Sequence, residues 1–179
     1  MTSMRRLRAG AALVVGVVVL TAGCEDAVEP TQFTSIKDRA EYKATTSEVD
    51  GVLGQAVQTA VAAAGGRRLN GADRASDTIC DPVYGRRFRE LEAGGTFVLD
   101  AGSVETGVEQ IRAAWKAKGW DVEVTPPGTV RLTQSTSTGV RFSVRAELRA
   151  VDNNPSLIGV SMSLLSTCLE LPDDVMDDL

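Results

Sequence analysis

The chain has 179 residues, of which 43% are hydrophobic, 24% are charged and 4% are aromatic. Its 24 acidic and 19 basic residues give a formal net charge of −5, which argues against a nucleic-acid-binding protein. The sequence contains no histidine, which removes Ser-His-Asp and Cys-His catalysis and the most frequent metal ligand.

The first 23 residues are predicted to be a signal peptide. Three arginines precede an apolar run of about ten residues, Ala11 to Leu20, which is too short to span a bilayer. The run ends in small residues directly before Cys24. This order of a basic segment, a short apolar segment and small residues is typical of an exported protein.

The segment LTAGC, which ends at Cys24, resembles the lipobox of bacterial lipoproteins. The resemblance implies that the Cys24 thiol carries diacylglycerol, that the leader is removed, and that acyl chains such as palmitate anchor the protein. We expect a lipid-anchored protein on the extracytoplasmic face of the cell membrane, with no cofactor besides this lipid. Secretion without lipid is the alternative, and the pair Arg5-Arg6 leaves the export route, general secretory or twin-arginine, open.

Removal of the leader changes the charge balance of the chain. The leader contains three of the 19 basic residues and none of the acidic ones, which leaves 16 basic and 24 acidic residues and a net charge of −8. Anionic lipid and nucleic acid therefore do not attract the mature chain as a whole.

Cys80 and Cys168 remain as a pair once Cys24 carries lipid. Because an exported domain meets oxidising conditions, we predict a disulfide between them. The enclosed loop has about 90 residues, for which chain entropy contributes roughly 4 to 5 kcal/mol. The C-x-x-C spacing of redox-active pairs is lacking, and two thiols without histidine make a poor zinc site.

Residues 24–44 are polar and aperiodic, so we predict a flexible tether with a reach of roughly 25 Å. A first helix is predicted from about Ser47, because valine and alanine recur on one face until Gly65-Gly66. The stretch that follows, residues 67–77, has the composition of a loop.

Two short strands are predicted near residues 86–91 and 96–99, separated by Gly94-Gly95. A second helix begins after Ser103 and ends at Gly119, and its apolar stripe includes Trp115.

Four segments of alternating hydrophobicity then follow, near residues 120–124, 130–132, 140–148 and 158–164. Short turn sequences separate them, which predicts an antiparallel meander. We therefore expect an α+β domain over residues 45–171, a two-layer sandwich in which two helices cover one face of the meander. Residues 172–179 are predicted to be an acidic, disordered tail.

The segments AAWKAKGW and DVEV, the meander, and the late Cys168 after a serine-rich strand resemble small lipoproteins of actinobacteria. In that family an earlier cysteine, here Cys80, pairs with the late one, and no activity is assigned. The resemblance implies the α+β fold and the disulfide, and it leaves the function open.

Four arginines form the candidate partner-binding face. Arg141, Arg145 and Arg149 recur at even spacing along one strand, and Arg131 shares the outward parity of its own strand. The ordinary interpretation is a solvated sheet face of mixed charge, since glutamates interrupt the arginines. The alternative is a face that binds an acidic envelope protein or an anionic polymer.

We expect a non-catalytic binding or interaction domain in the cell envelope, without a metal site. The sequence contains no G-x-S-x-G, S-x-x-K or Walker motif, and the acidic C-terminal residues lack the spacing of a calcium-binding loop. Two other classes are less favoured: a carrier or sensor of a small apolar ligand held between helices and sheet, and a hydrolase that uses a pair of carboxylates.

Overall fold

The structure is a computed structural model that describes residues 33–71, 74–80, 85–152 and 154–177. The predicted signal peptide and Cys24 lie outside the described residues. The elements in chain order are β1 (Thr34–Ser35), α1 (Arg39–Ala63), β2 (Arg67–Gly71), β3 (Ser76–Ile79), β4 (Phe88–Leu99), α2 (Val104–Lys116), β5 (Asp121–Thr125), β6 (Thr129–Ser135), β7 (Arg141–Val151), β8 (Asn154–Ser166), β9 (Leu169–Glu170) and α3 (Asp173–Met176).

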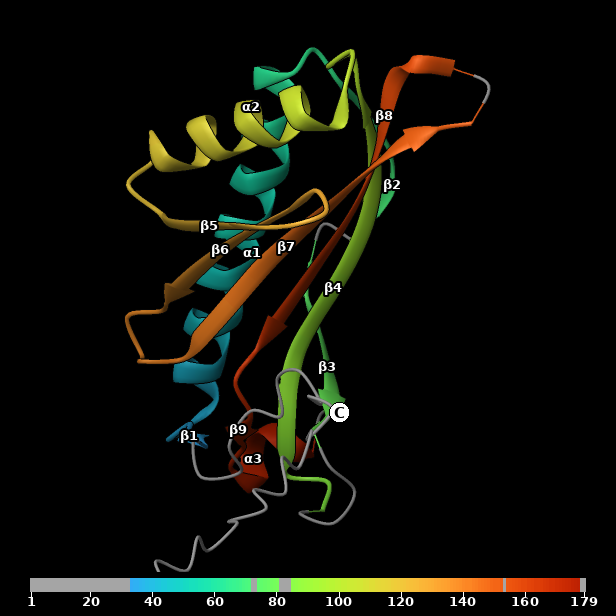
Figure 1. Ribbon diagram of the computed structural model, residues 1–179. Helices are drawn as coiled ribbons and strands as arrows, with labels where there is room; N and C mark the ends of the chain where they lie inside the picture. The colour runs from blue at the N-terminus through green and yellow to red at the C-terminus, as the bar shows by residue number, and fades with distance from the viewer. Residues whose placement is uncertain (1–32, 72–73, 81–84, 153, 178–179) are drawn as a thin grey trace, which may run out of the picture.

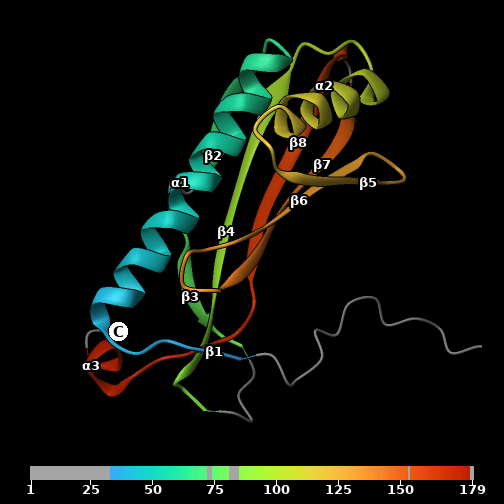
Figure 2. The same ribbon diagram turned by 90° about the vertical axis from the view of Figure 1, so that its left-hand side faces the viewer.

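The fold is α+β, as predicted: a mostly antiparallel open sheet packs against two main helices. Within the described residues the sheet has nine strands, with the path β1-β9-β4-β8-β7-β6-β5, and β2 and β3 pair with β4 beside this path. In Figure 1, α1 lies behind the sheet and α2 lies near its upper end. Figure 2 shows both helices from the side and the strong twist of the sheet.

The predicted meander is confirmed. β5, β6, β7 and β8 follow one another as antiparallel neighbours, and the longest pairing is between β7 and β8. Their alternating apolar residues point to the helices, so Leu132, Val144 and Leu164 are almost fully buried. The meander ends against β4, which pairs antiparallel with β8 over residues 92–99.

Two predictions for the segment before α2 were wrong. The expected loop at residues 67–77 contains strand β2 and the start of β3, which both pair with the outer edge of β4. The two short strands expected around Gly94-Gly95 are one strand, because Gly94 and Gly95 pair with Ser163 and Met162 of β8. Backbone pairing with a distant strand outweighs the weak strand preference of glycine here.

The predicted tether is too long at its C-terminal end. α1 begins at Arg39 rather than near Ser47, since the Asp38 side chain caps the helix by accepting from the Glu41 amide at 2.9 Å. Before the helix, β1 pairs in parallel with β9, and Ile36 is buried. Residues 34–44 therefore belong to the domain.

The C-terminal segment also differs from the predicted disordered tail. Residues 173–176 form α3, and Val175 packs into the core with 3% of its surface exposed. An ion pair of 3.2 Å joins Asp173 to Arg87, and the Arg39 guanidinium donates to the carbonyl oxygen of Asp174. Packing of Val175 and Met176 against the core, with contacts from Arg39 and Arg87, holds this acidic segment in place.

The two helices meet at a buried tryptophan. The Trp115 indole Nε1 donates a hydrogen bond of 3.0 Å to the carbonyl oxygen of Ala56 in α1. Small residues on α1 make this approach possible, because Ala56 and Ala60 are fully buried. At the end of α1, a Cβ on Gly66 would lie 2.3 Å from the carbonyl oxygen of Val98, so only glycine fits there.

Candidate binding face

The candidate site is the side of the sheet opposite the helices. Because side chains alternate along a strand, the residues between the core positions of β6, β7 and β8 share this outward side. We call it the arginine face; the four predicted arginines lie on it, Arg131 on β6 and the other three on β7. Strand register places Glu123, Arg131, Arg145 and Ser163 in one row across four strands. The described helices all lie away from this side (Figure 1).

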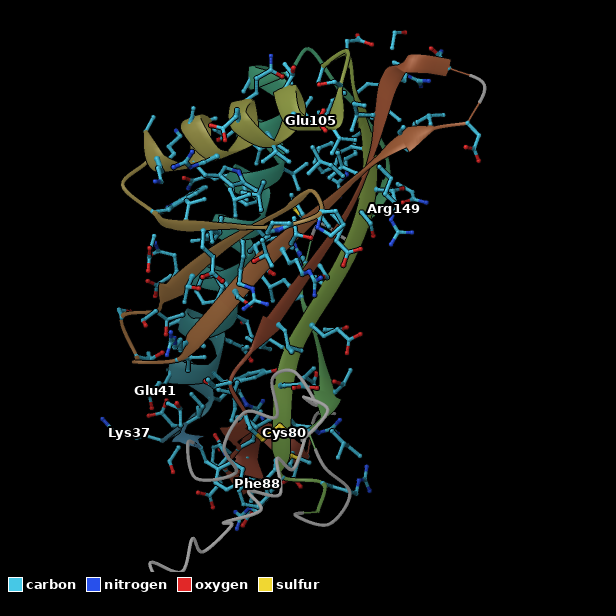
Figure 3. The ribbon with its side chains drawn as sticks, viewed as in Figure 1. Lys37, Glu41, Cys80, Phe88, Glu105 and Arg149 are labelled. Atoms are coloured by element: carbon cyan, nitrogen blue, oxygen red, sulfur yellow. A yellow bond between two sulfur atoms is a disulfide. The ribbon has the colours of Figure 1, made fainter. Side chains whose placement is uncertain are left out.

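Glu147 lies between two of the arginines and pairs with both. Its two carboxylate oxygens are 3.0 Å from an Arg145 Nη2 and 3.3 Å from an Arg149 Nη2. Arg149 is 82% exposed and stands near the upper end of the sheet (Figure 3). Arg131 forms a cross-strand pair of 3.4 Å with Glu123 of β5.

These pairs show that the arginine face has mixed charge, as the ordinary interpretation of the sequence expects. Exposed ion pairs of this kind stabilise a fold by about 0 to 1 kcal/mol, because water and salt screen both charges. The arginines can therefore exchange their glutamate for another carboxylate or phosphate at little cost. On β6, β7 and β8, four arginines face outward against Glu147, and the acidic residues Glu123 of β5 and Glu92 of β4 border them on the same side, so the positive charge is concentrated on the three middle strands only.

The rest of the arginine face is covered by small hydroxyl side chains and by apolar side chains that include Leu157 and Leu165. Thr133, Ser143, Ser161 and Ser163 share the outward parity of the arginines. Leu165 is 45% exposed and lies opposite Ser143. Hydroxyl groups donate and accept hydrogen bonds, so this surface suits a polar, anionic partner better than an apolar one.

A second polar cluster joins α1 to the edge of the sheet. Arg89 of β4 and Asp77 of β3 form an ion pair of 3.4 Å, and their side chains are only 12% and 17% exposed. Tyr42 of α1 adds a hydrogen bond to Asp77. Burial, followed by the negative charge of Asp77, raises the pKa of Tyr42 from 10.0 to about 12. Sequence analysis missed this cluster, since its three residues lie on three elements.

The raised pKa of Tyr42 predicts a loss of stability in alkali. The folded state favours the neutral phenol, so its contribution is fully present below pH 10 and is lost as the pH rises from about 10 to 12. Urea unfolding at pH 9 and pH 11 should show a smaller pH-dependent loss for Tyr42→Phe than for the wild type. Equal losses in both proteins would assign the alkaline effect to other groups.

A third polar cluster holds the β6–β7 loop on α1. The Glu48 carboxylate accepts hydrogen bonds from the Ser137 amide and hydroxyl, both at 2.9 Å. Nearby, the hydroxyls of Thr45 and Thr138 are 2.7 Å apart. The polar groups of this cluster form hydrogen bonds with one another, so the cluster holds the β6–β7 loop against α1.

The predicted disulfide between Cys80 and Cys168 is present. The two Cα atoms are 6.0 Å apart, and the bond connects the end of β3 to the start of β9. Such a bond is consistent with an extracytoplasmic domain. The predicted lipidation of Cys24 lies outside the described residues.

A pocket between α1 and the sheet bears on the carrier hypothesis. Its lining includes Leu53, Val57, Phe97 and Met162, and it has room for about one water molecule. A small apolar ligand would require the helix to move away from the sheet.

Membrane-spanning and metal-binding features are lacking from the described part of the chain. None of its helices combines the length and the apolar character needed to cross a membrane. Within residues 33–71, 74–80, 85–152 and 154–177, no three acidic or cysteine side chains are grouped so as to hold a metal ion. Comparison with protein-family models, with curated proteins and with solved structures found no match to this chain.

Proposed function

We propose that this protein is a lipoprotein of the extracytoplasmic membrane face whose α+β domain binds an acidic partner in the cell envelope through the arginine face. The leader and the LTAGC segment support the location, and the disulfide is consistent with it. In this proposal the domain is a binding module without catalysis. The lipoproteins of actinobacteria that the sequence resembles are the expected relatives.

The observation that carries the binding proposal is the placement of four arginines on the side of the sheet that faces away from the described helices, in an acidic protein. The mature chain has a net charge of −8, whereas β6, β7 and β8 together present four outward arginines and one outward glutamate. A guanidinium group binds carboxylates and phosphates with two parallel hydrogen bonds. Arg145 and Arg149 flank Glu147, so an incoming acidic group can take the place of this carboxylate between them.

Reversal of these charges tests the proposal. The probes are immobilised polyglutamate and polyphosphate, and the measurement is the Kd of the purified full chain over a series of salt concentrations. We expect Arg145→Glu with Arg149→Glu to weaken binding about tenfold or more, which corresponds to about 1.4 kcal/mol. The fold should be retained, because the pairs that are lost are exposed.

The matched control changes the same amount of charge on α2. Arg112→Glu with Lys116→Glu alters two solvent-accessible positions of that helix, on the helix-bearing side of the molecule. If both double variants weaken binding equally, the net charge of the protein and not the arginine face determines affinity. If neither polyglutamate nor polyphosphate binds the wild-type chain, the proposal of an acidic partner is contradicted.

A further inference from the structure

We infer that the domain binds a second copy of itself through the outward side of the sheet, in a two-fold dimer in which arginines of β7 face glutamates of β4. This inference rests on the proposed function and deepens it, since it identifies the acidic partner of the arginine face as another molecule of this chain. The evidence is the distribution of charge over three neighbouring strands, of which β8 lies between β7 and β4 (Figure 1).

The three strands carry different charges on their outward side. On β7 the outward charged residues are three arginines and one glutamate. On β8 the outward residues are uncharged: Leu157, Gly159, Ser161, Ser163 and Leu165. On β4 the outward residues are two acidic and three uncharged ones: Glu90, Glu92, Gly94, Thr96 and Val98. An uncharged strand therefore separates a mainly basic strand from an acidic one.

Strand register places the basic and acidic groups at the same height on the two sides of β8. Leu165 of β8 pairs with Ser143 of β7 on one side and with Glu92 of β4 on the other. Two residues farther along, the same register brings Arg141 and Glu90 to one level. The charges are therefore arranged symmetrically about β8 but with opposite sign.

A two-fold axis makes use of this arrangement. If the axis runs along β8 in the plane between two copies, it places β7 of one copy over β4 of the other, and the reverse contact follows by symmetry. Arg141 and Arg145 of each copy then lie opposite Glu90 and Glu92 of the second copy. Twisted sheets pack face to face in this way, with their strands about 30° apart.

The charged groups can form these new pairs at little cost. Glu92 and Arg141 are exposed, and Arg145 pairs with Glu147 in an ion pair that is open to solvent. Burial, followed by the negative charge of Glu92, raises the pKa of Glu90. A guanidinium group from a second copy would therefore stabilise the charged form of this carboxyl.

The centre of the interface is uncharged. Leu165, which is 45% exposed, lies next to the axis among the serines of β8. A centre depleted of charge with charged groups around it is the usual composition of an interface. Four strands over about seven residues give roughly 900 Å² of contact in total, which is the size of a weak complex. We therefore expect a weak dimer that salt dissociates.

An exchange of charge between two variants tests the inference. One double variant carries Arg141→Glu with Arg145→Glu, and the other carries Glu90→Arg with Glu92→Arg. Sedimentation velocity measures association of the full chain at low salt, in detergent with micelles in excess over protein. We expect a micromolar Kd for the wild type and association at least about tenfold weaker for each variant alone, because like charges then face each other. An equal mixture of the two variants should regain the wild-type association, since every arginine then faces a glutamate.

The control is Arg112→Glu with Lys116→Glu on α2, which has the same net charge as the first variant and should dimerise like the wild type. Loss of dimerisation in this control, or a mixture that stays monomeric, would overturn the inference. Should the arginines on β4 unfold the chain, Glu92→Gln retains the size of the side chain, and it must still weaken the dimer.

Polyglutamate binding, measured on the same samples, separates this inference from the proposed function. A wild-type chain that binds polyglutamate but stays monomeric at every concentration would overturn the dimer and leave the binding of an acidic partner intact. A chain that neither dimerises nor binds polyglutamate or polyphosphate would contradict both.

Discussion

Removal of the disulfide, by Cys80→Ser together with Cys168→Ser, is expected to lower the free energy of unfolding by about 4 to 5 kcal/mol. The two cysteines are 88 residues apart in the sequence, so the bond restricts a long loop of the unfolded chain. Because a domain of this size has a stability of about 5 to 15 kcal/mol, this loss is a large fraction of the total. Urea unfolding followed by tryptophan fluorescence measures it.

The wild-type chain reduced with dithiothreitol is the control for this double variant. Both proteins lack the bond, so their unfolding curves should agree. A loss below about 1 kcal/mol in both would mean that the unfolded chain is already compact around these residues.

The same bond is expected to protect the end of the domain formed by β1 and β9. Cys80 donates a backbone hydrogen bond to Phe88, and the carbonyl of Cys168 accepts one from Thr34. In the double variant the amides of Thr34 and Ile36 should exchange with solvent earlier than those of β7. Equal exchange in these two regions would show that the bond acts only on the unfolded state.

Trp115→Ala is expected to cost about 3 to 5 kcal/mol of stability. The side chain is fully buried, its indole donates to Ala56 of α1, and its ring packs against Trp120 at a centroid distance of 6.4 Å. Truncation leaves a cavity between the two helices and the sheet. Denaturant unfolding monitored by circular dichroism measures the loss without relying on the deleted fluorophore.

Two substitutions serve as controls for this prediction. Trp115→Phe retains much of the apolar volume but lacks the indole donor, so we expect a smaller loss. Trp120→Ala removes the partner ring, which is only half-buried, and should also cost less. If Trp120→Ala costs as much as Trp115→Ala, the pair of rings and not the buried contact with α1 holds α2 in place.

Substitutions on the arginine face should not lower the stability of the fold, in contrast to removal of the disulfide or of Trp115. Its charged residues form exposed pairs outside the core, whereas the disulfide and Trp115 connect elements across the fold. Charge reversal at Arg145 and Arg149 should therefore change binding while the unfolding curve is nearly unchanged.

Sequence alone determined the elements that depend on local patterns. The alternation of apolar residues in β5 to β8, with turn residues between them, predicted the meander and also placed the four arginines on one side. Ser103 and the apolar stripe ending at Trp115 predicted α2. Two remaining cysteines in a chain that was predicted to be exported indicated the disulfide. Each of these predictions depends on residues that are close in sequence or, for the disulfide, on the ability of cysteine to form a covalent pair.

Tertiary structure decided the features that depend on backbone pairing between distant segments. Gly94-Gly95 interrupt a local strand pattern, and only β8 makes β4 continuous across them. Thr34–Ser35 is a strand only because β9 is its neighbour, and α3 is ordered only where Val175 meets the core. The Tyr42–Asp77–Arg89 cluster likewise comes from packing, because a hydrogen bond and an ion pair join residues of three elements whose sequence positions predict no contact.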